Sequence, residues 1–498
     1  MAGRNAIDLS PYKEIIIAKF KDGTSAESIS LYLLSNHDVT VAEKTIRRRL
    51  LEWGVRRNSQ ICDTPLLRER ISVLFHTCCL PDQDILHILQ QEGHDINECS
   101  LTRIRRKMGL LRRIDSRNVE KSEKAVEDIV QKELDKGEVE GHSRVRNRGH
   151  IARDRLSPMV RKRDLEGVAQ PLNDLQRLRG EYIIPGPNYL WSINGYRKLQ
   201  PWGIEVYAAI DAYSRYIVWI YVGVSTCTAV NILQQYIHAV DSLQIVPQMV
   251  RAARTDEGAE APPIAFAQHR FTQKHRPDAS LNDCFRYGTR VTNQRITAWW
   301  SQLSRSSLSR WQDYFEELST VGTYNDSRIA DKIAMLAVYM PILRKDIHGF
   351  SQLWNVHSIR RQANRPNSVS GKPVILFNWP PEGVGNYGVK PDPELITQFK
   401  QDTTQWDIEE YLPSTTMNWC TDQLKQLGAP KGIVSSSARY PDGSQVHPKI
   451  YLQLRDRIKT HMEMDESPKL ELLEKSTGAW NWDGDELGHG DEIEILDL

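Results

Sequence analysis

Three short β-rich segments constrain the fold of this chain more than any other sequence feature. They cover residues 189–193, 203–210 and 216–222, and β-branched and aromatic residues dominate them. Only the run from Asp211 to Arg215 joins the second segment to the third. The pattern therefore predicts three neighbouring strands that follow one another as a meander.

The segments that follow extend this prediction to a mixed sheet. A helix is expected at 229–243, a short strand at 249–254 that ends in Thr255-Asp256, and a long amphipathic helix at 291–318. This order is that of an RNase H-like α/β core with a mixed five-stranded sheet, which we place at 181–380. On the long helix, Trp299, Trp300 and Trp311 are expected to pack in the core rather than to stack on bases. Because 498 residues exceed one ordinary core, we expect an α+β protein of several domains.

The N-terminal residues 1–60 predict a helix-turn-helix unit. Two capping boxes begin at Thr24 and Thr40, and the helix after the second box ends at Gly54. A helix, a short turn and a basic helix are typical of proteins whose second helix enters the DNA major groove. The basic residues of this helix are Lys44, Arg47, Arg48 and Arg49.

Residues 61–115 repeat the plan and predict a second unit like a helix-turn-helix. Its basic helix ends at Gly109, and Ile46 and Leu101 each lie eight residues before the glycine that ends their helix. A plain helical bundle with a solvated basic surface is the alternative, but two copies of the pattern favour DNA binding. The basic residues of the second helix are Arg103, Arg105, Arg106 and Lys107.

Charge is distributed unevenly along the chain. Residues 1–380 carry a net charge of +12 and residues 381–498 one of −11, which suggests a polyanionic partner for the first part. Residues 116–180 predict a charged helical linker, and residues 381–498 an acidic, partly disordered C-terminal region. No run approaches the roughly 20 apolar residues of a membrane helix. The seven irregularly spaced cysteines favour a reducing compartment.

The stretch from residue 182 to about residue 380 resembles the integrase core domain of fungal transposon-derived proteins, which share a superfamily with DDE transposases and retroviral integrases. The residues that carry the resemblance are 191–199, 210–215, 254–258, 292–300 and 353–357.

The resemblance implies a triad of acids that hold two Mg²⁺ ions for strand transfer. The family has Asp in Trp-x-x-Asp-Gly, Asp in Ser-Asp-x-Gly and Glu in Asn-x-Arg-Ile-Glu. This chain has Asn194, Asp256 and Thr297 at those positions, with intact spacings of 62 and 41 residues. Because two carboxylates are replaced, we expect the catalytic positions to hold metal weakly, if at all, at Asp256. Asn293 and Arg295 flank the third position and could face a phosphate.

Neighbouring acids offer no evident replacement triad. Asp211 is expected to cap its own turn, and Glu205 lies on a strand whose facing the sequence leaves open. Glu260 lies four residues past Asp256 and could reach the site. Glu316 and Glu317 are roughly 28–30 Å along the helix from Thr297, which is too far.

The sequence thus favours a nuclear, integrase-derived protein that binds double-stranded DNA and has lost strand-transfer activity. We expect no cofactor, with Mg²⁺ only where activity remains, and no membrane association; a homo-oligomer is left open. Two alternatives remain at this point. One is an active Mg²⁺-dependent polynucleotidyl transferase, and the other is a non-catalytic scaffold for protein interactions.

Overall fold

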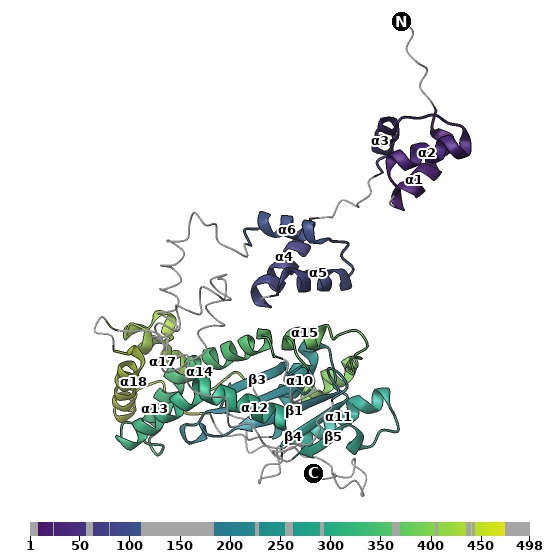
Figure 1. Cartoon of the computed structure of the whole chain (residues 1–498). Coiled ribbons are helices and arrows are strands. Elements are labelled where there is room, and N and C mark those ends of the chain that lie inside the picture. Colours follow the sequence, from purple (N-terminus) through teal and green to yellow (C-terminus); the bar gives the residue numbers. More distant parts are fainter. Residues whose placement is uncertain are drawn as a thin grey trace. The chain divides into compact units, whose positions relative to one another are not determined.

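The computed structural model comprises two compact units, residues 1–111 and 112–498, which are described separately (Figure 1). It describes residues 8–110 and 184–473, apart from 23, 56–62, 79, 225–228, 254–261, 289–292, 361–368, 404–406, 435–439 and 441–443. The predicted linker 116–180 and the tail 474–498 therefore lie outside the described residues.

The first three helices enclose a small apolar core around Ile16, Ile29 and Ile46. The Ser25 hydroxyl accepts a hydrogen bond from the Ser28 amide at 3.0 Å, so Ser25 caps the second helix and the predicted cap Thr24 does not. The third helix has Ala42 at its N-cap and no side-chain cap, so the capping box predicted from Thr40 is wrong. The helices are α1 (Lys13–Lys21), α2 (Ala26–His37) and α3 (Glu43–Glu52).

The next three helices form a second bundle of the same kind. Thr64 and Asn97 cap its first and last helices through their side-chain oxygens. Gly109, with φ of 73°, follows the last helix as Gly54, with φ of 68°, follows α3. The helices are α4 (Pro65–Ser72), which a π-helical turn extends to Thr77, α5 (Asp82–Gln91) and α6 (Glu98–Lys107).

The second unit is built on one mixed five-stranded sheet with the order β3-β2-β1-β4-β5. The first three strands pair antiparallel, while β4 pairs parallel with both β1 and β5. This topology is RNase H-like and confirms the fold predicted from the sequence. The strands are β1 (Leu190–Tyr196), β2 (Glu205–Asp211), β3 (Ile217–Gly223), β4 (Met249–Ala253) and β5 (Phe285–Gly288).

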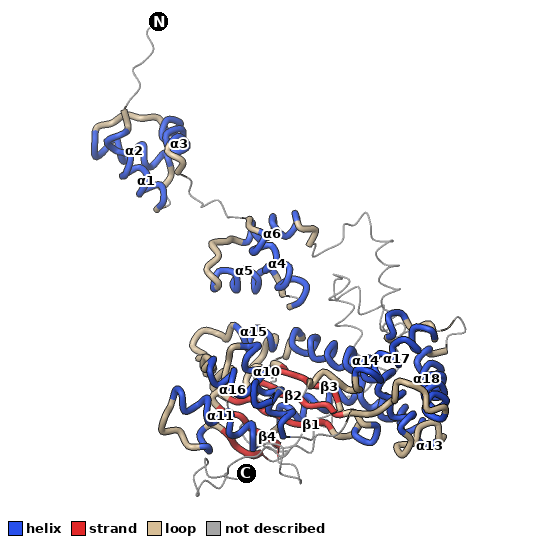
Figure 2. The backbone as a smooth tube through the Cα atoms, turned by 180° about the vertical axis from the view of Figure 1, so that it is seen from behind, coloured by secondary structure: helices blue, strands red, loops and turns tan. Residues whose placement is uncertain are grey.

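Helices cover both faces of the sheet (Figure 2). One face presents Val206, Ala208 and Ile210 to α12 (Gln294–Leu303), α13 (Ser309–Thr320) and α14 (Ile329–Val356). The other presents Trp191, Ile193, Tyr207 and Ala209 to α10 (Ala229–Leu243), α11 (Pro262–His275) and α16 (Pro393–Thr403). The period-two alternation of each strand therefore assigns every strand residue to one of two cores.

The long helix expected at 291–318 is present as α12 and α13, which a π-helical segment at Ser304–Leu308 joins. Trp299, Trp300 and Trp311 are 0 %, 7 % and 3 % exposed and belong to the core beneath α14. Their core role is as predicted.

The change of composition at residue 381 does not end the folded unit. Phe399 on α16, Leu424 on α17 (Ser414–Gln426) and Tyr451 on α18 (Val446–Glu463) are buried in the same two cores as the sheet. The short helix α15 (Pro373–Asn378) precedes them. The acidic residues of this region lie between apolar positions with helical spacing, and net charge obscures that spacing. Within the described part of the chain, no helix is both long and apolar enough to cross a bilayer.

Candidate nucleic-acid interface and the altered acid positions

Helix α3 carries a basic stripe on its outward side. Ile46 and Leu50 face the bundle core, which leaves Lys44, Arg47 and Arg48 at the surface. The side chains of Arg47 and Arg48 are 70 % and 62 % exposed and pair with Glu43 and Glu52 on the same helix. Exposed pairs of this kind contribute little, so both guanidinium groups can exchange partners for phosphate. Arg49 is only 30 % exposed and lies 2.7 Å from Glu52.

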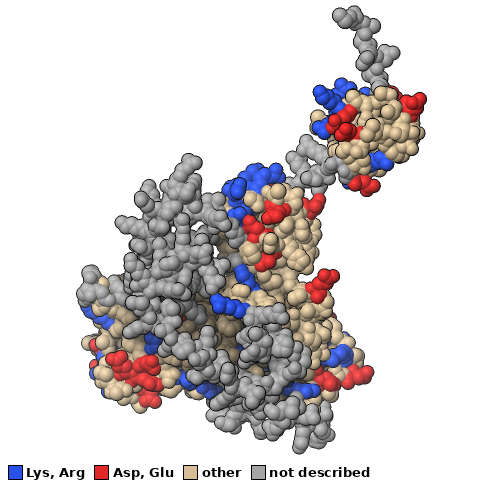
Figure 3. Space-filling view, in the orientation of Figure 1, with Lys and Arg blue, Asp and Glu red and all other residues tan. Residues whose placement is uncertain are grey.

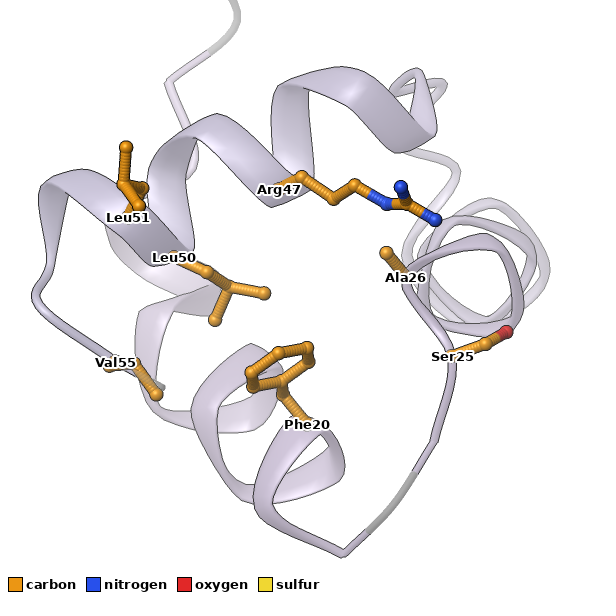
Figure 4. Close-up of a pocket in the computed structure, with 7 residues that line it drawn as sticks. All are labelled: Phe20, Ser25, Ala26, Arg47, Leu50, Leu51 and Val55. Carbon is orange, nitrogen blue, oxygen red and sulfur yellow. The ribbon is translucent and has the colours of Figure 1, made fainter. Parts of the chain in front are cut away.

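A cavity of about 410 Å³ lies beside this stripe, between α1, α2 and α3. Phe20 and Leu50 point into it, and the Arg47 side chain extends across its rim toward Ala26 and Ser25 (Figure 4). Arg47 therefore lies near the N-terminus of α2, where backbone amides and the helix dipole already favour an anion.

Helix α6 presents a second basic stripe. Arg103, Arg106 and Lys107 are exposed at i, i+3 and i+4. Lys and Arg side chains gather on the surface of this bundle (Figure 3). Cys99, a free and exposed cysteine, lies one turn before Arg103 on the same side of the helix.

Arg105 does not belong to this stripe, contrary to the prediction from sequence. Its side chain is 6 % exposed and pairs with Asp82 at 3.2 Å. It also donates to the Leu110 carbonyl and stacks over Phe75. Arg105 thus fastens α6 to α5 and closes the helix end, and it is not available to DNA.

Asn194 lies near the carboxyl end of β1, on the sheet face that α12 covers. It is opposite Ala208, and two residues later Tyr196 contacts Trp300 of α12, with ring centroids 5.5 Å apart. The Asn194 Oδ1 atom accepts from the Gly195 amide at 2.8 Å, so the side chain presents its Nδ2 donor outward.

Thr297 lies in the first turns of α12, one turn before Trp300. Since Trp300 contacts Tyr196, this placement brings Thr297 and Asn194 to the same junction of β1 and α12. Both side chains are half-buried and so remain reachable from solvent. The Thr297 hydroxyl donates to the Asn293 carbonyl at 2.9 Å, a local bond that satisfies it within the helix.

Asn293 and Arg295 flank Thr297, as the sequence predicts. Asn293 is the N-cap residue of α12, yet its side chain makes no capping hydrogen bond. It is 0 % exposed, and neither its Oδ1 nor its Nδ2 has a hydrogen-bond partner among the described residues. Arg295 is half-buried in the first turn of the same helix.

Asp256 and Glu260 lie outside the described residues; β4 ends three residues before Asp256. The groups that can be tested do not fit a magnesium site. Asn194 offers a neutral amide and Thr297 a neutral hydroxyl, whereas Mg²⁺ prefers carboxylates and water. No group of three acidic, histidine or cysteine side chains suited to a metal occurs in the described part of the chain.

The neighbouring acids serve other purposes. Asp211 is wholly buried and accepts hydrogen bonds from the Asn188 amide at 2.7 Å and from the Ser214 amide and hydroxyl at 2.8 and 2.6 Å, which is the predicted turn cap. Burial raises its pKa to about 6. Glu205 lies on the same face of β2 as Tyr207, opposite to the face of Asn194. Neither acid can therefore replace the side chain at Asn194 or Thr297.

Two arginines on the same sheet face as Asn194 were not singled out from the sequence. Arg251 on β4 is the register partner of both Ser192 on β1 and Arg286 on β5, so all three lie on the face of Asn194. The sequence could have indicated both arginines, because each is the single charged residue in a short apolar strand.

Residues 181–371 match the family described as integrase core domain. The match begins before β1 and ends after α14, so it covers the entire sheet and α12. Residues 181–371 therefore form an integrase core domain, which has a polynucleotidyl-transferase-type fold. Among curated proteins, no sequence matches this chain.

Proposed function

We propose that this protein is a nuclear DNA-binding protein derived from an integrase or transposase, and that it no longer performs strand transfer. The observation that carries the proposal is the pair of exposed basic stripes on α3 and α6. Each stripe is fixed by a buried apolar face on the same helix, and the chain that bears them continues into an integrase core.

In the proposed complex, α2 with α3 and α5 with α6 act as helix-turn-helix units on double-stranded DNA. Helices α3 and α6 would enter the major groove, where Lys44, Arg47 and Arg48 and their counterparts on α6 meet phosphates and base edges. The N-terminus of α2, with Arg47 beside it, is suited to one backbone phosphate.

The proposed loss of catalysis follows from the groups at positions 194 and 297. With two neutral side chains in place of carboxylates, the site lacks most of the charge that would hold two Mg²⁺ ions. DNA binding is therefore expected without any cofactor, and Mg²⁺ matters only if residual activity remains.

Salt-dependent binding to a duplex tests the proposal. Replacement of Lys44, Arg47 and Arg48 by Ala, or of Arg103, Arg106 and Lys107 by Ala, should weaken binding about 10-fold to 1000-fold at moderate salt. Each triple variant should also reduce the slope of log K against log salt by about two to three. A matched control removes three exposed lysines elsewhere, Lys425, Lys449 and Lys459, and should leave both quantities unchanged. Equal losses in all three variants would refute a specific interface.

Cys99 supplies an independent test of groove entry. A duplex that carries a disulfide-activated thiol tether on a major-groove base edge should cross-link to the native chain at Cys99, and Cys99→Ser should abolish the product. Cross-linking that is equally efficient with the tether in the minor groove would contradict the proposed orientation of α6.

A further inference from the structure

We infer that Leu51 on α3 contacts the C5-methyl group of a thymine in the major groove, whereas Arg106, its counterpart on α6, contacts a guanine. The two helices would then be specific for different bases. This inference rests on the proposed DNA-binding function and names the base that each helix recognises.

Leu51 and Arg106 occupy equivalent positions in the two bundles. Each carbonyl accepts a hydrogen bond from the amide of the glycine that follows the helix, Gly54 or Gly109, at 3.0 Å. In both bundles the carbonyl one residue earlier accepts from the residue after that glycine, at 2.9 Å. The buried residues correspond as well: Ile29, Val41 and Ile46 in the first bundle match Ile85, Ile96 and Leu101 in the second. The two helices therefore differ at this position in their side chain and not in their backbone.

Leu51 belongs to the outward row of α3, which we define as Lys44, Arg48 and Leu51. These residues are spaced i, i+4 and i+7, so they lie on one side of the helix over about 10 Å. Ile46 and Leu50 occupy the buried side. Leu51 is 72 % exposed, more than any other large apolar side chain in the described part of the chain. In the proposed complex this row, with Leu51 in it, faces the base edges.

The cations beside Leu51 favour DNA over an apolar protein surface as its partner. The side chains of Arg47 and Arg48 are 70 % and 62 % exposed, and burial against an apolar surface would cost them their hydration. On DNA, phosphates on either side of the groove supply counter-charges. Among the base edges in the major groove, thymine alone carries an apolar group, its C5-methyl. A leucine side chain, which has no donor or acceptor, is suited to contact that group.

The outward row of α6 has a different chemistry at its last position. It consists of Cys99, Arg103 and Arg106, all of which are exposed. Arg106 thus presents a guanidinium group where α3 presents an apolar one. Arginine forms two parallel hydrogen bonds with O6 and N7 of guanine, which is the commonest specific contact in the major groove. The two bundles therefore place different base preferences on the same backbone.

Removal of thymine methyl groups one at a time tests the assignment of Leu51. Selection from a random duplex library by the full-length chain first gives a preferred duplex. Fluorescence anisotropy then compares this duplex with versions in which one thymine at a time is replaced by uracil. At least one replacement should weaken binding by the wild type about threefold to fivefold, the effect of one lost methyl contact.

Leu51→Ala should bind the thymine and uracil versions at that position equally. Leu31→Ala is the matched control, because Leu31 is a leucine of α2 that is 59 % exposed, and this variant should keep the discrimination of the wild type. The same comparison with 7-deazaguanine, which lacks the N7 acceptor, tests Arg106. At least one such replacement should weaken wild-type binding about fivefold or more and should leave binding by Arg106→Ala unchanged.

A preferred duplex in which no thymine methyl group affects affinity would overturn the assignment of Leu51 while salt-dependent DNA binding stands. Discrimination that survives in Leu51→Ala, or that Leu31→Ala loses equally, would overturn it as well. A wild-type chain that does not bind duplex DNA at low salt would overturn both the inference and the proposed function. Thermal unfolding of each variant shows whether a loss of affinity instead reflects a loss of folded protein.

Discussion

Asp211 ties the end of β2 to two other pieces of backbone. Its carboxylate accepts from Asn188, which precedes β1, and from Ser214 in the β2–β3 turn. Asn188 in turn accepts from the Trp191 indole at 3.0 Å. One carboxylate in an integrase core can thus be wholly structural, although it lies in a motif shared with the family.

The burial of Asp211 predicts a pH dependence of stability. Its pKa is raised from 3.8 to about 6, so between these values the folded state binds a proton that the unfolded state does not. This protonation stabilises the folded state by about 3 kcal/mol below pH 3.8, and the stabilisation is lost as the pH rises through 6. Urea unfolding of the wild type and of Asp211→Asn, followed by tryptophan fluorescence from pH 4 to 7, measures it. The difference in unfolding free energy between wild type and Asp211→Asn should change between pH 4 and 6. A difference that stays constant would contradict the prediction.

The neighbours Arg105 and Arg106 should have opposite mutant phenotypes. Arg105→Ala leaves Asp82 and the Leu110 carbonyl without their partner and should lower the unfolding free energy of the second bundle by about 2–3 kcal/mol. Arg106→Ala removes an exposed charge and should change stability by less than about 0.5 kcal/mol. DNA affinity at matched folded fraction should fall only for Arg106→Ala. Denaturation and anisotropy on both variants check this, and a stable Arg105→Ala that binds DNA weakly would reverse the assignment.

Among the secondary-structure elements, α14 protects the exposed edge of the sheet. β3 is an edge strand, and Asn355 near the end of α14 bonds to both backbone groups of Ile217, accepting from its amide at 2.7 Å and donating to its carbonyl at 3.2 Å. Trp354 adds a bond from its indole to the Arg215 carbonyl at 2.8 Å. Residues 354 and 355 of the motif at 353–357 therefore satisfy backbone groups at this edge that a further strand would otherwise pair.

Asn355→Ala should therefore lower the free energy of unfolding by about 2 kcal/mol, because it removes two hydrogen bonds at a partly buried strand edge. Asn355→Asp keeps the acceptor and loses the donor, so its free energy of unfolding should lie between those of Asn355→Ala and the wild type. Gln352→Ala on the same helix is the control, since Gln352 is exposed and should be neutral. Hydrogen exchange at the Ile217 amide should rise in Asn355→Ala alone, and unchanged protection there would argue against the edge role.

The sequence predicted most elements well because strand alternation and helical spacing are local signals. Strands β1 to β4 and the basic helices α3 and α6 follow directly from them. Burial within a helix was harder to predict. Arg105 and Arg106 are adjacent and chemically identical, and only packing against α5 separates them. The helical spacing of the C-terminal region was obscured by its charge, and the register that unites Arg251 with Arg286 depends on contacts between distant strands. Ser25 rather than Thr24 caps α2, because the Ser25 hydroxyl accepts from the Ser28 amide. The sequence pattern does not distinguish these two adjacent hydroxyl residues.

On the scale of the whole molecule, the chain joins helical bundles with exposed basic stripes to an integrase core domain. The unit at residues 1–111 offers exposed cations on α3 and α6, and the unit at residues 112–498 keeps the sheet and helices of an integrase core. Asn194 and Thr297, where the proposal places two lost carboxylates, lie on elements that contact each other. Under the proposed function, loss of charge rather than loss of geometry is the expected barrier to catalysis.

That distinction predicts the behaviour of a double revertant. Asn194→Asp combined with Thr297→Glu returns carboxylates to both elements, and Mg²⁺-dependent nicking of supercoiled DNA should rise at least about tenfold over wild type. The control Asn194→Asp with Ala298→Glu has the same net charge but places one carboxylate on the wrong side of α12, and it should stay at background. Asp256→Ala in the revertant should abolish the gain. If the wild type already nicks DNA with Mg²⁺ or Mn²⁺ and loses that activity on Asp256→Ala, the chain is an active enzyme and the loss of two carboxylates has been compensated elsewhere.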